Sequence, residues 1–442
     1  MESAGEYGSQ HSPMPDVSTD VDILHLIPKP ASIEDTGLSQ WLLADLACKH
    51  LAESGVLDLG QIAERMALPG IVIEELFHFL RAEGRIELSS RRDDSPLLRF
   101  NLTDRGRILA AEAQSRDGYV GPAPITLELY ERIISAQSAT LYPMTREFTE
   151  SLFADTVIAP ELLGRLGPAI HSGRAIFIYG QPGTGKSYLA RRLKRALGPP
   201  LYLPHALVAG DSIIRYFDPS IHKPVAREKE PNNIVPTRVD DSRLLLCERP
   251  MVVAAGELTM DLLDLQFDSS KRLYVAPLQL KANGGLLIID DLGRQRIPPE
   301  TLLNRWIMPM EERRDQLSLS TGQHVSVPFD LTLIFSTNLE PMDLADEAFL
   351  RRIGYKVRLK PSTPTEYRSI WQQCCDQLGI EFDQEILNYV MQEFYPKESV
   401  PLLPCHPRDL LQLSTDITAY LGKPAIDKDA IHWAWQNYFL EI

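Results

Sequence analysis

The sequence lacks the cysteine pairs, apolar runs and leader segment that would mark several classes of protein. Its 442 residues contain no CxxC pair and an odd number of cysteines, Cys48, Cys247, Cys374, Cys375 and Cys405. This usage predicts buried free thiols in a reducing compartment, so a cytoplasmic protein is expected. Residues 1–16 have no basic region followed by an apolar run, which argues against a signal peptide. No stretch approaches the roughly 18 apolar residues of a membrane span.

Positive charge is also scarce. The net charge of −15 argues against a phosphate-binding surface over the whole chain, although a local basic patch remains open. The length exceeds one ordinary hydrophobic core and predicts about two or three domains.

The first part of the chain predicts a small domain that follows a polar tail. Residues 1–20 are rich in Ser, Gly, Pro and acids, which is typical of disorder. Helical spacing follows in "SQWLLADLACKHLAESG", "LGQIAERMAL" and "IVIEELFHFLRAEG", and then the strand-like "RIEL" and "LLRFNLT" flank a polar loop. A last helix is expected to begin at the cap Thr103. This order resembles a winged helix over residues 21–118, an α+β fold.

The charge of this region indicates whether its binding partner is DNA or a protein. Residues 21–118 contain 16 acids and 11 bases, a net of −5. The helix expected to read DNA offers Glu74, Glu75 and Glu83 against Arg81 and Arg85. Carboxylates repel the phosphate backbone, so docking of a protein is favoured over DNA contact. The loop between the strands is locally basic at Arg91 and Arg92, but Asp93 and Asp94 offset them.

The pattern of apolar residues divides the rest of the chain into three segments. Residues 119–150 are expected to be a connector, residues 151–362 an α/β domain and residues 363–442 a helical domain. The runs "AIFIY", "GGLLIID" and "LTLIFSTN" are continuously apolar, as strands buried on both faces must be. Their alternation with helical segments predicts a parallel sheet.

A glycine-rich motif between a strand and a helix predicts nucleotide binding. "GQPGTGKS" matches G-x-x-x-x-G-K-S in full, after "AIFIY" and before the helical "SYLARRLKRAL". Its glycines allow a backbone path that directs N–H groups at phosphate oxygens, while its Lys reaches the β- and γ-phosphates and its Ser ligates Mg²⁺. The predicted ATP-binding residues are Gly180, Gln181, Pro182, Gly183, Thr184, Gly185, Lys186, Ser187 and Tyr188.

Two acids end the second apolar strand. Asp290 is expected to hold Mg²⁺ together with Ser187. In the family that the order of motifs resembles (below), the next residue is commonly a Glu that acts as base for the attacking water, and the resemblance implies this role for Asp291. Asp291 is one methylene shorter than a Glu, roughly 1.5 Å, and a displacement of about 1 Å costs on the order of a hundredfold in rate. Slow or normal hydrolysis is favoured over none.

With "GQPGTGKS", "LLIIDD", "IFSTN", "AFLRRIGYKVRL" and "HPRDLL" in this order, residues 151–442 resemble an AAA+ ATPase. The resemblance implies an α/β P-loop NTPase sheet with a helical lid, ATP and Mg²⁺ as ligands, and a homo-oligomeric ring, with a hexamer expected. It implies that Asn338 orients the water as sensor one. Arg351 or Arg352 would enter the neighbouring subunit's site as the arginine finger, and Arg408 would read the γ-phosphate as sensor two.

Two further stretches resemble the MoxR, chelatase and enhancer-binding branch. "SLSTGQHVSVP", residues 318–328, predicts a hairpin directly before the sensor-one strand, and residues 251–281 resemble the insert that lines the central pore in that branch. The GAFTGA loop of enhancer-binding activators is replaced by "AAGELTMD", which argues against contact with a sigma factor in the same way.

Three functions remain open at this point. The first is an ATP-driven machine that remodels or moves a protein client recruited by the winged helix. The second is an ATP-gated regulator or loader that uses the winged helix on DNA. The third is an ATP switch without hydrolysis.

Overall fold

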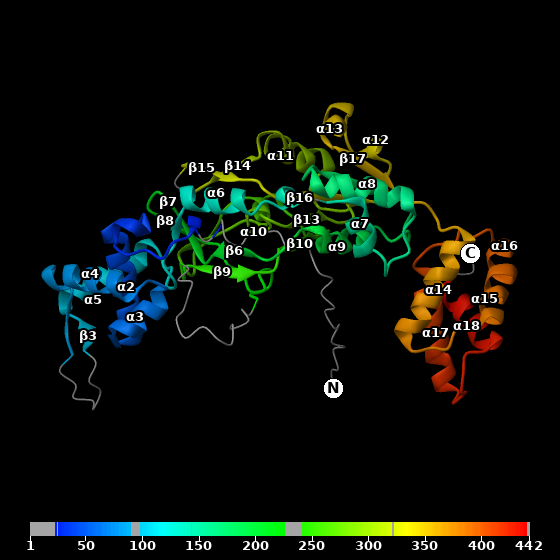
Figure 1. Cartoon of the computed structure of the whole chain (residues 1–442), viewed down its shortest axis with the longest axis horizontal. Coiled ribbons are helices and arrows are strands. Elements are labelled where there is room, and N and C mark those ends of the chain that lie inside the picture. The colour runs from blue at the N-terminus through cyan, green and yellow to red at the C-terminus, as the bar shows by residue number, and fades with distance from the viewer. Residues whose placement is uncertain are drawn as a thin grey trace.

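The computed structural model describes residues 23, 25–89, 98–142, 144–225, 241–320 and 322–439. The predicted tail and the charged residues 91–94 lie outside these ranges. The molecule is elongated, with N-terminal helices at one end, the sheets in the middle and C-terminal helices at the other end (Figure 1). Every helix within these ranges is too short or too polar to span a bilayer.

The N-terminal elements combine helices with a small antiparallel sheet of order β1-β3-β2. In chain order they are η1 (Glu34–Thr36), α2 (Gln40–Ser54), β1 (Val56–Asp58), α3 (Leu59–Met66), α4 (Gly70–Ala82), β2 (Ile86–Leu88), β3 (Arg99–Leu102) and α5 (Asp104–Arg116). The helices and the hairpin expected from the sequence are present, and β1 is an addition that the pattern did not predict.

Local side-chain chemistry fixes the starts of these helices. The Asp58 carboxylate accepts from the Gln61 backbone N–H (2.8 Å), while the Gln61 side chain accepts from the Asp58 N–H (3.1 Å). This capping box satisfies donors that the first turn of α3 leaves free. Thr103 caps α5, as predicted, because its hydroxyl accepts from the Gly106 N–H at 3.0 Å.

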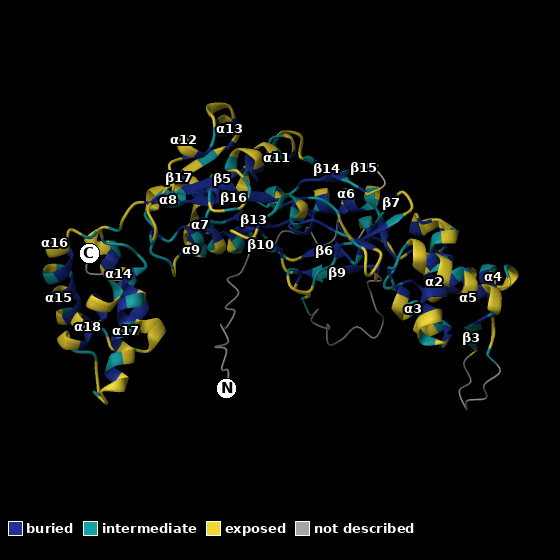
Figure 2. Cartoon of the chain, turned by 180° about the vertical axis from the view of Figure 1, so that it is seen from behind, coloured by how far each residue is buried: buried dark blue, intermediate teal, exposed yellow. Residues whose placement is uncertain are grey.

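The main sheet is parallel and has the order β10-β13-β16-β5-β17 in the described part of the chain. Its strands are β5 (Ile176–Tyr179), β10 (Met251–Ala254), β13 (Leu286–Ile289), β16 (Thr332–Thr337) and β17 (Tyr355–Arg358). Numbered along the chain, the order is 2-3-4-1-5. The three predicted apolar runs form β5, β13 and β16, and these strands lie buried inside the central body (Figure 2).

Helices cover both faces of this sheet, which explains why its strands are apolar throughout. The flanking elements are α7 (Arg146–Leu152), α8 (Pro160–His171), α9 (Lys186–Arg192), η3 (Leu193–Ala196), α11 (Pro299–Glu312), α12 (Pro341–Leu344) and α13 (Glu347–Arg352). Phe177 packs in one core with Trp306 of α11, whereas its neighbour Ile176 packs in the other with Leu166 of α8. Successive strand residues thus serve opposite faces.

A second sheet, of order β11-β12-β8-β7-β4 in the described ranges, lies between the main sheet and the N-terminal elements (Figure 1). Its strands are β4 (Ile125–Thr126), β7 (Ala206–Ala209), β8 (Ser212–Arg215), β11 (Gln266–Asp268) and β12 (Leu273–Val275). Two strand pairs accompany it, β6 (Leu201–Pro204) with β9 (Leu244–Cys247) and β14 (Arg314–Ser318) with β15 (His324–Pro328). The second pair is the hairpin predicted before β16.

Residues 119–150, expected to be a connector, carry buried structure. They include β4, α6 (Leu127–Ala136) and η2 (Ala139–Leu141), and Tyr130 and Ile133 of α6 are fully buried. The stretch 251–281, expected to be an insert, begins with β10 of the main sheet and continues through η4 (Met260–Leu263), β11 and β12 to α10 (Leu278–Lys281).

The C-terminal residues form a helical unit with a core of its own. Its elements are α14 (Pro364–Leu378), α15 (Gln384–Tyr389), the π-helical turn η5 (Val390–Phe394), α16 (Tyr395–Glu398), α17 (His406–Tyr420) and α18 (Lys428–Tyr438). Trp371, Leu410 and Trp435 lie at the centre of this core, and the α17–α18 pair closes it.

Candidate nucleotide site

The glycine-rich motif forms a tight loop between β5 and α9. Gly180, Gly183 and Gly185 have φ values of 144°, 80° and 85°, in the left-handed region that side chains disfavour. A Cβ atom on Gly180 would lie 2.3 Å from the Leu359 carbonyl oxygen, so no side chain fits there. The loop follows a parallel strand and opens a helix, as a phosphate-binding loop must. The fold is an α/β P-loop fold.

Lys186 lies inside the loop. Its side chain is 6% exposed, and its ammonium donates to the carbonyl oxygens of Gly180 (2.9 Å) and Gln181 (2.8 Å). Burial lowers the Lys186 pKa, and the negative charges of Asp291 and Asp290 act in the opposite direction. The structure therefore brings the predicted phosphate-binding cation and both predicted acids together.

Ser187 and Asp290 meet although 103 residues separate them. The Ser187 hydroxyl donates to Asp290 Oδ1 at 3.0 Å. Hydroxyl and carboxylate oxygens are the hard ligands that Mg²⁺ prefers, and Mg²⁺ at such sites completes its shell with water and phosphate. The pair fits Mg²⁺ bound with a nucleotide.

Asp291 lies beside Asn338 at the next strand end. The Asn338 amide donates to Asp291 Oδ1 over 3.5 Å, a long contact. Asp291 has a φ of 50°, in the left-handed region. The following residue is tied to β16, because the Leu292 N–H donates to the Ser336 carbonyl and the Thr337 hydroxyl donates to the Leu292 carbonyl, each at 2.7 Å.

The two candidate finger arginines differ in how they are held. Arg351 pairs with Glu347 one turn earlier at 2.6 Å, and both side chains are more than 70% exposed. Arg352 pairs with Glu311 of α11 at 2.5 Å and also donates to the Ala348 carbonyl. Arg352 is therefore fixed to a second helix, whereas Arg351 extends from the end of α13 into solvent.

The C-terminal unit contacts the phosphate loop directly. The Cys405 N–H donates to the Gly183 carbonyl at 3.3 Å, and a Cβ atom on Gly183 would lie 2.7 Å from Cys405 Sγ and 3.1 Å from Leu403 Cδ1. Arg408 is exposed on the first turn of α17, three residues after this contact. Tyr188 is half-exposed, and the Arg192 guanidinium lies 4.9 Å from its ring centre.

Sequence reasoning missed Gln295, which lies in "DDLGRQR" directly after the two acids. Its amide nitrogen donates to the carbonyl oxygens of Asp290 (2.9 Å) and Asp291 (3.3 Å). A polar residue a few positions after a pair of site acids was the available signal.

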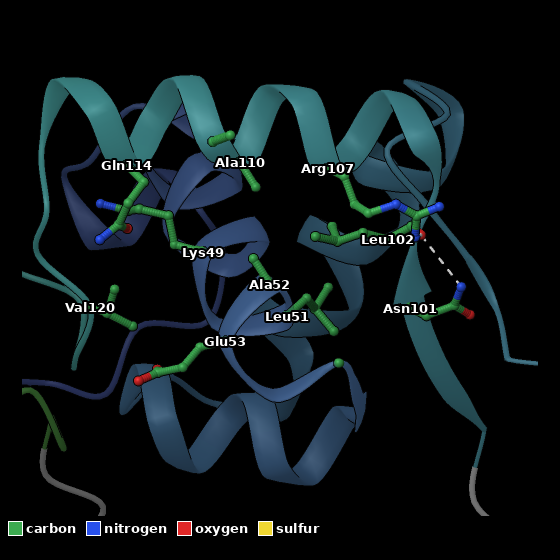
Figure 3. A pocket seen from close by; sticks show the side chains of 12 residues that line it. Lys49, Leu51, Ala52, Glu53, Asn101, Leu102, Arg107, Ala110, Gln114 and Val120 are labelled. Atoms are coloured by element: carbon green, nitrogen blue, oxygen red, sulfur yellow. Dashed lines mark hydrogen bonds between the residues drawn. The ribbon is translucent and has the colours of Figure 1, made fainter.

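The described residues also line two open surface pockets far from the phosphate loop. One of about 500 Å³ lies between α2 and α5, with Lys49, Glu53 and Gln114 in its wall (Figure 3). A neighbouring pocket of about 710 Å³ shares Glu53 and Gln114 and reaches Arg215 of the second sheet. Both belong to the N-terminal half of the molecule and take no part in the nucleotide site.

Comparison with known proteins adds a match over the C-terminal unit and distant likenesses of fold. Residues 363–437 match a family described as a domain of unknown function, DUF8689. No curated protein matches the chain.

Three solved structures illustrate the likenesses. The RuvB Holliday junction branch migration motor of Thermotoga maritima is 14% identical, with 67% of this chain and 73% of that chain covered and a TM-score of 0.37. Domain III of the replication initiation protein DnaA from the same organism is 16% identical (68% and 100% covered, TM-score 0.39). A model of the BchI–BchD complex of magnesium chelatase is 17% identical (63% and 92% covered, TM-score 0.34). These values are low, so the fold assignment rests on the strand order and the phosphate loop of the chain itself.

Proposed function

We propose that the chain is an AAA+ ATPase that binds and hydrolyses Mg-ATP in a ring-shaped homo-oligomer, with a hexamer expected. The observation that carries this proposal is the 3.0 Å contact between the Ser187 hydroxyl and the Asp290 carboxylate, beside Lys186 in the loop. The order of motifs along residues 151–442 supports the family.

The side chains of the site would divide the work. Lys186 and the backbone N–H groups of the loop bind the phosphates, and Ser187 with Asp290 holds Mg²⁺. The bound metal neutralises charge that develops on the phosphate oxygens. Asp291 accepts a proton from the attacking water, which Asn338 orients.

Arg351 is the better candidate for the finger. A finger must leave its own subunit and reach a neighbour's γ-phosphate, where a guanidinium is suited to bridge phosphate oxygens. Arg351 gives up only an exposed pair with Glu347, and such a pair contributes little. Arg352 would have to leave Glu311 on another helix. The site is then completed only by a second copy of the chain.

The C-terminal unit would act as the lid. Its contact with Gly183 places the start of α17 at the phosphate loop, and from there Arg408 would read the γ-phosphate. Loss of that phosphate would change the lid's position and so drive motion between subunits.

The N-terminal domain, proposed to be a winged helix, would recruit a protein client. Helix α4 exposes Ile71, Glu74, Glu75 and His78, and its last turn exposes Arg81. Its Glu75 carboxylate is engaged with the Ile33 N–H at 2.9 Å. An apolar and acidic face suits a protein better than a phosphate backbone. The five free cysteines agree with a reducing cytoplasm, where we place the protein.

The decisive experiment is ATP turnover per subunit against protein concentration. We expect turnover to fall on dilution, as sites shared between subunits come apart, and to vanish in Lys186→Ala. Lys29→Ala, an exposed lysine, is the matched control. Flat turnover in a confirmed monomer would contradict the shared site. A salt-sensitive DNA shift that requires ATP would replace the protein client with DNA.

A further inference from the structure

One side chain closes the turn that carries both acids. The Gln295 amide nitrogen donates to the Asp290 carbonyl (2.9 Å) and the Asp291 carbonyl (3.3 Å), and its amide oxygen accepts from the Gly293 N–H (2.9 Å). We propose that Gln295 is a positioning residue, which holds Asp291 in the backbone conformation that directs its carboxylate toward Asn338 and the attacking water. This role rests on the proposed ATPase function.

The orientation of the amide follows from its partners. Two carbonyl oxygens face one end of the Gln295 side chain, and only the NH₂ group donates to them. An N–H faces the other end and needs an acceptor. The flipped amide would oppose oxygen to two oxygens and N–H to N–H, so the hydrogen bonds determine a single arrangement.

The turn needs such a clamp because its backbone is unusual. A φ of 50° at Asp291 is uncommon for any residue with a side chain, although Asp tolerates it better than most. Such conformations persist when the surroundings over-determine them. The Asp291 carbonyl accepts from the Arg294 N–H (3.0 Å) as well as from Gln295, so two donors fix the orientation of this peptide group.

The far side of the turn is held independently of Gln295. Leu292 is buried and exchanges hydrogen bonds with Ser336 and Thr337 of β16. Loss of Gln295 therefore leaves the turn attached to the sheet and the core intact. It loosens the peptide groups that orient the two acids, which keep the Arg294 N–H on the Asp291 carbonyl and Asp290 Oδ1 on the Asp291 N–H (3.1 Å). The expected defect is in catalysis rather than in folding or in nucleotide binding.

The test compares Gln295→Ala and Gln295→Glu with the wild type, with Gln377→Ala on the exposed face of α14 as the matched control. A glutamate keeps the length but has no donor, and its charge would face two carbonyl oxygens, so it should be the more harmful change. We expect kcat to fall at least tenfold in Gln295→Ala, which is about 1.4 kcal/mol in the barrier. KM, the Kd for Mg-ATP and the melting temperature should stay near wild-type values.

A double-mutant cycle separates positioning from a general structural effect. In the Asp291→Asn background the group to be positioned is already disabled, so adding Gln295→Ala should change the residual rate less than twofold. An equal fold loss in both backgrounds would overturn the proposal, as would wild-type kcat in Gln295→Ala, or a loss of nucleotide affinity or melting temperature that accounts for the defect. If the wild type itself does not turn over ATP, the proposed function fails and this role fails with it.

Discussion

If the chain hydrolyses ATP as proposed, lengthening the carboxylate at position 291 should slow turnover. The Asp291 carboxylate lies 3.5 Å from the Asn338 amide nitrogen, already at the long end of a hydrogen bond. Its left-handed backbone sets the direction in which the side chain leaves the turn. A longer side chain that leaves the turn in the same direction would carry its carboxylate past the position that the Asp291 carboxylate occupies.

The size of the effect follows from the displacement. Asp291→Glu adds one methylene, roughly 1.5 Å, whereas a misplacement of about 1 Å costs on the order of a hundredfold in rate. Some of this shift is absorbed by rotation of the longer side chain, so we expect kcat to fall roughly ten- to hundredfold. Asp291→Asn should fall further, because the amide no longer accepts the proton.

The assay is steady-state ATP turnover, with the Kd for Mg-ATP measured in parallel. Asp416→Glu, on the exposed face of α17, is the matched control for an added methylene. Turnover of Asp291→Glu at or above the wild-type rate would refute the reasoning. Unchanged turnover in Asp291→Asn would show that Asp291 is not the base.

Three further changes test other parts of the molecule. Arg351→Ala should abolish ATP turnover without weakening ATP binding, and mixing it with the Lys186→Ala protein should restore turnover. Arg352→Ala should retain more turnover than Arg351→Ala. If Arg352→Ala loses more, Arg352 is the arginine finger. Arg243→Ala should lower the denaturant-derived free energy of unfolding by about 3–5 kcal/mol, since it strands the buried carboxylate with which Arg243 pairs at 2.7 Å. Burial lowers the pKa of His406 to about 4, against the charge of Asp409. As pH falls from about 6.5 to 4, His406 is protonated in the unfolded chain but stays neutral in the folded chain. The free energy of unfolding should therefore drop by up to about 3 kcal/mol across that pH range. An equal drop in His406→Gln would contradict this assignment.

The sequence predicted those parts of the fold that local chemistry determines. "GQPGTGKS" needs eight consecutive residues and its two flanking elements, and the loop forms there. The hairpin before β16 and the cap at Thr103 likewise depend on residues close in sequence. The three apolar runs form buried strands, because a sheet that is covered by helices on both faces buries every side chain of its central strands.

The second sheet was not predicted, for a physical reason. Its strands are only two to four residues long. The pairs β7–β8 and β11–β12 are local, but the sheet is completed by β4 against β7 and β12 against β8, which lie far apart in the sequence. Short strands carry little periodicity, and their partners are chosen by tertiary packing. Residues 119–150 were expected to be a connector although α6 shows helical spacing of its buried residues; only β4, two residues long, could not have been recognised from the sequence.

At the candidate site, residue types were predictable but the selection among them was not. The sequence pattern predicted either Arg351 or Arg352 as the finger, and only the position of Glu311 on α11 distinguishes the two. The role inferred for Gln295 depends on hydrogen bonds to backbone carbonyls, and a sequence does not display the orientation of a peptide group. The left-handed backbone at Asp291 was equally hidden, because Asp is common in turns of every kind.

A buried polar network connects α6 and the β14–β15 pair to the start of the strands that carry the candidate site. The Asn283 amide donates to the Tyr130 hydroxyl of α6 (2.9 Å) and to the Pro328 carbonyl at the end of β15 (2.8 Å), and its oxygen accepts from the Asp330 N–H (3.0 Å). Asn283 and Tyr130 are fully buried, so breaking one contact leaves a polar group without water.

This network lies at the N-terminal ends of β13 and β16, whereas Asp290, Asp291 and Asn338 lie at the opposite ends. A strand of four residues spans only about 13 Å and does not stretch. Sliding β13 against β16 would break their parallel ladder of hydrogen bonds, from Leu286 opposite Thr332 onward. The two ends of these strands are therefore rigidly connected. Beyond the network, Tyr130 packs in one core with Leu207 and Ile214 of the second sheet, whose Ala206 and Ile213 pack into the N-terminal core.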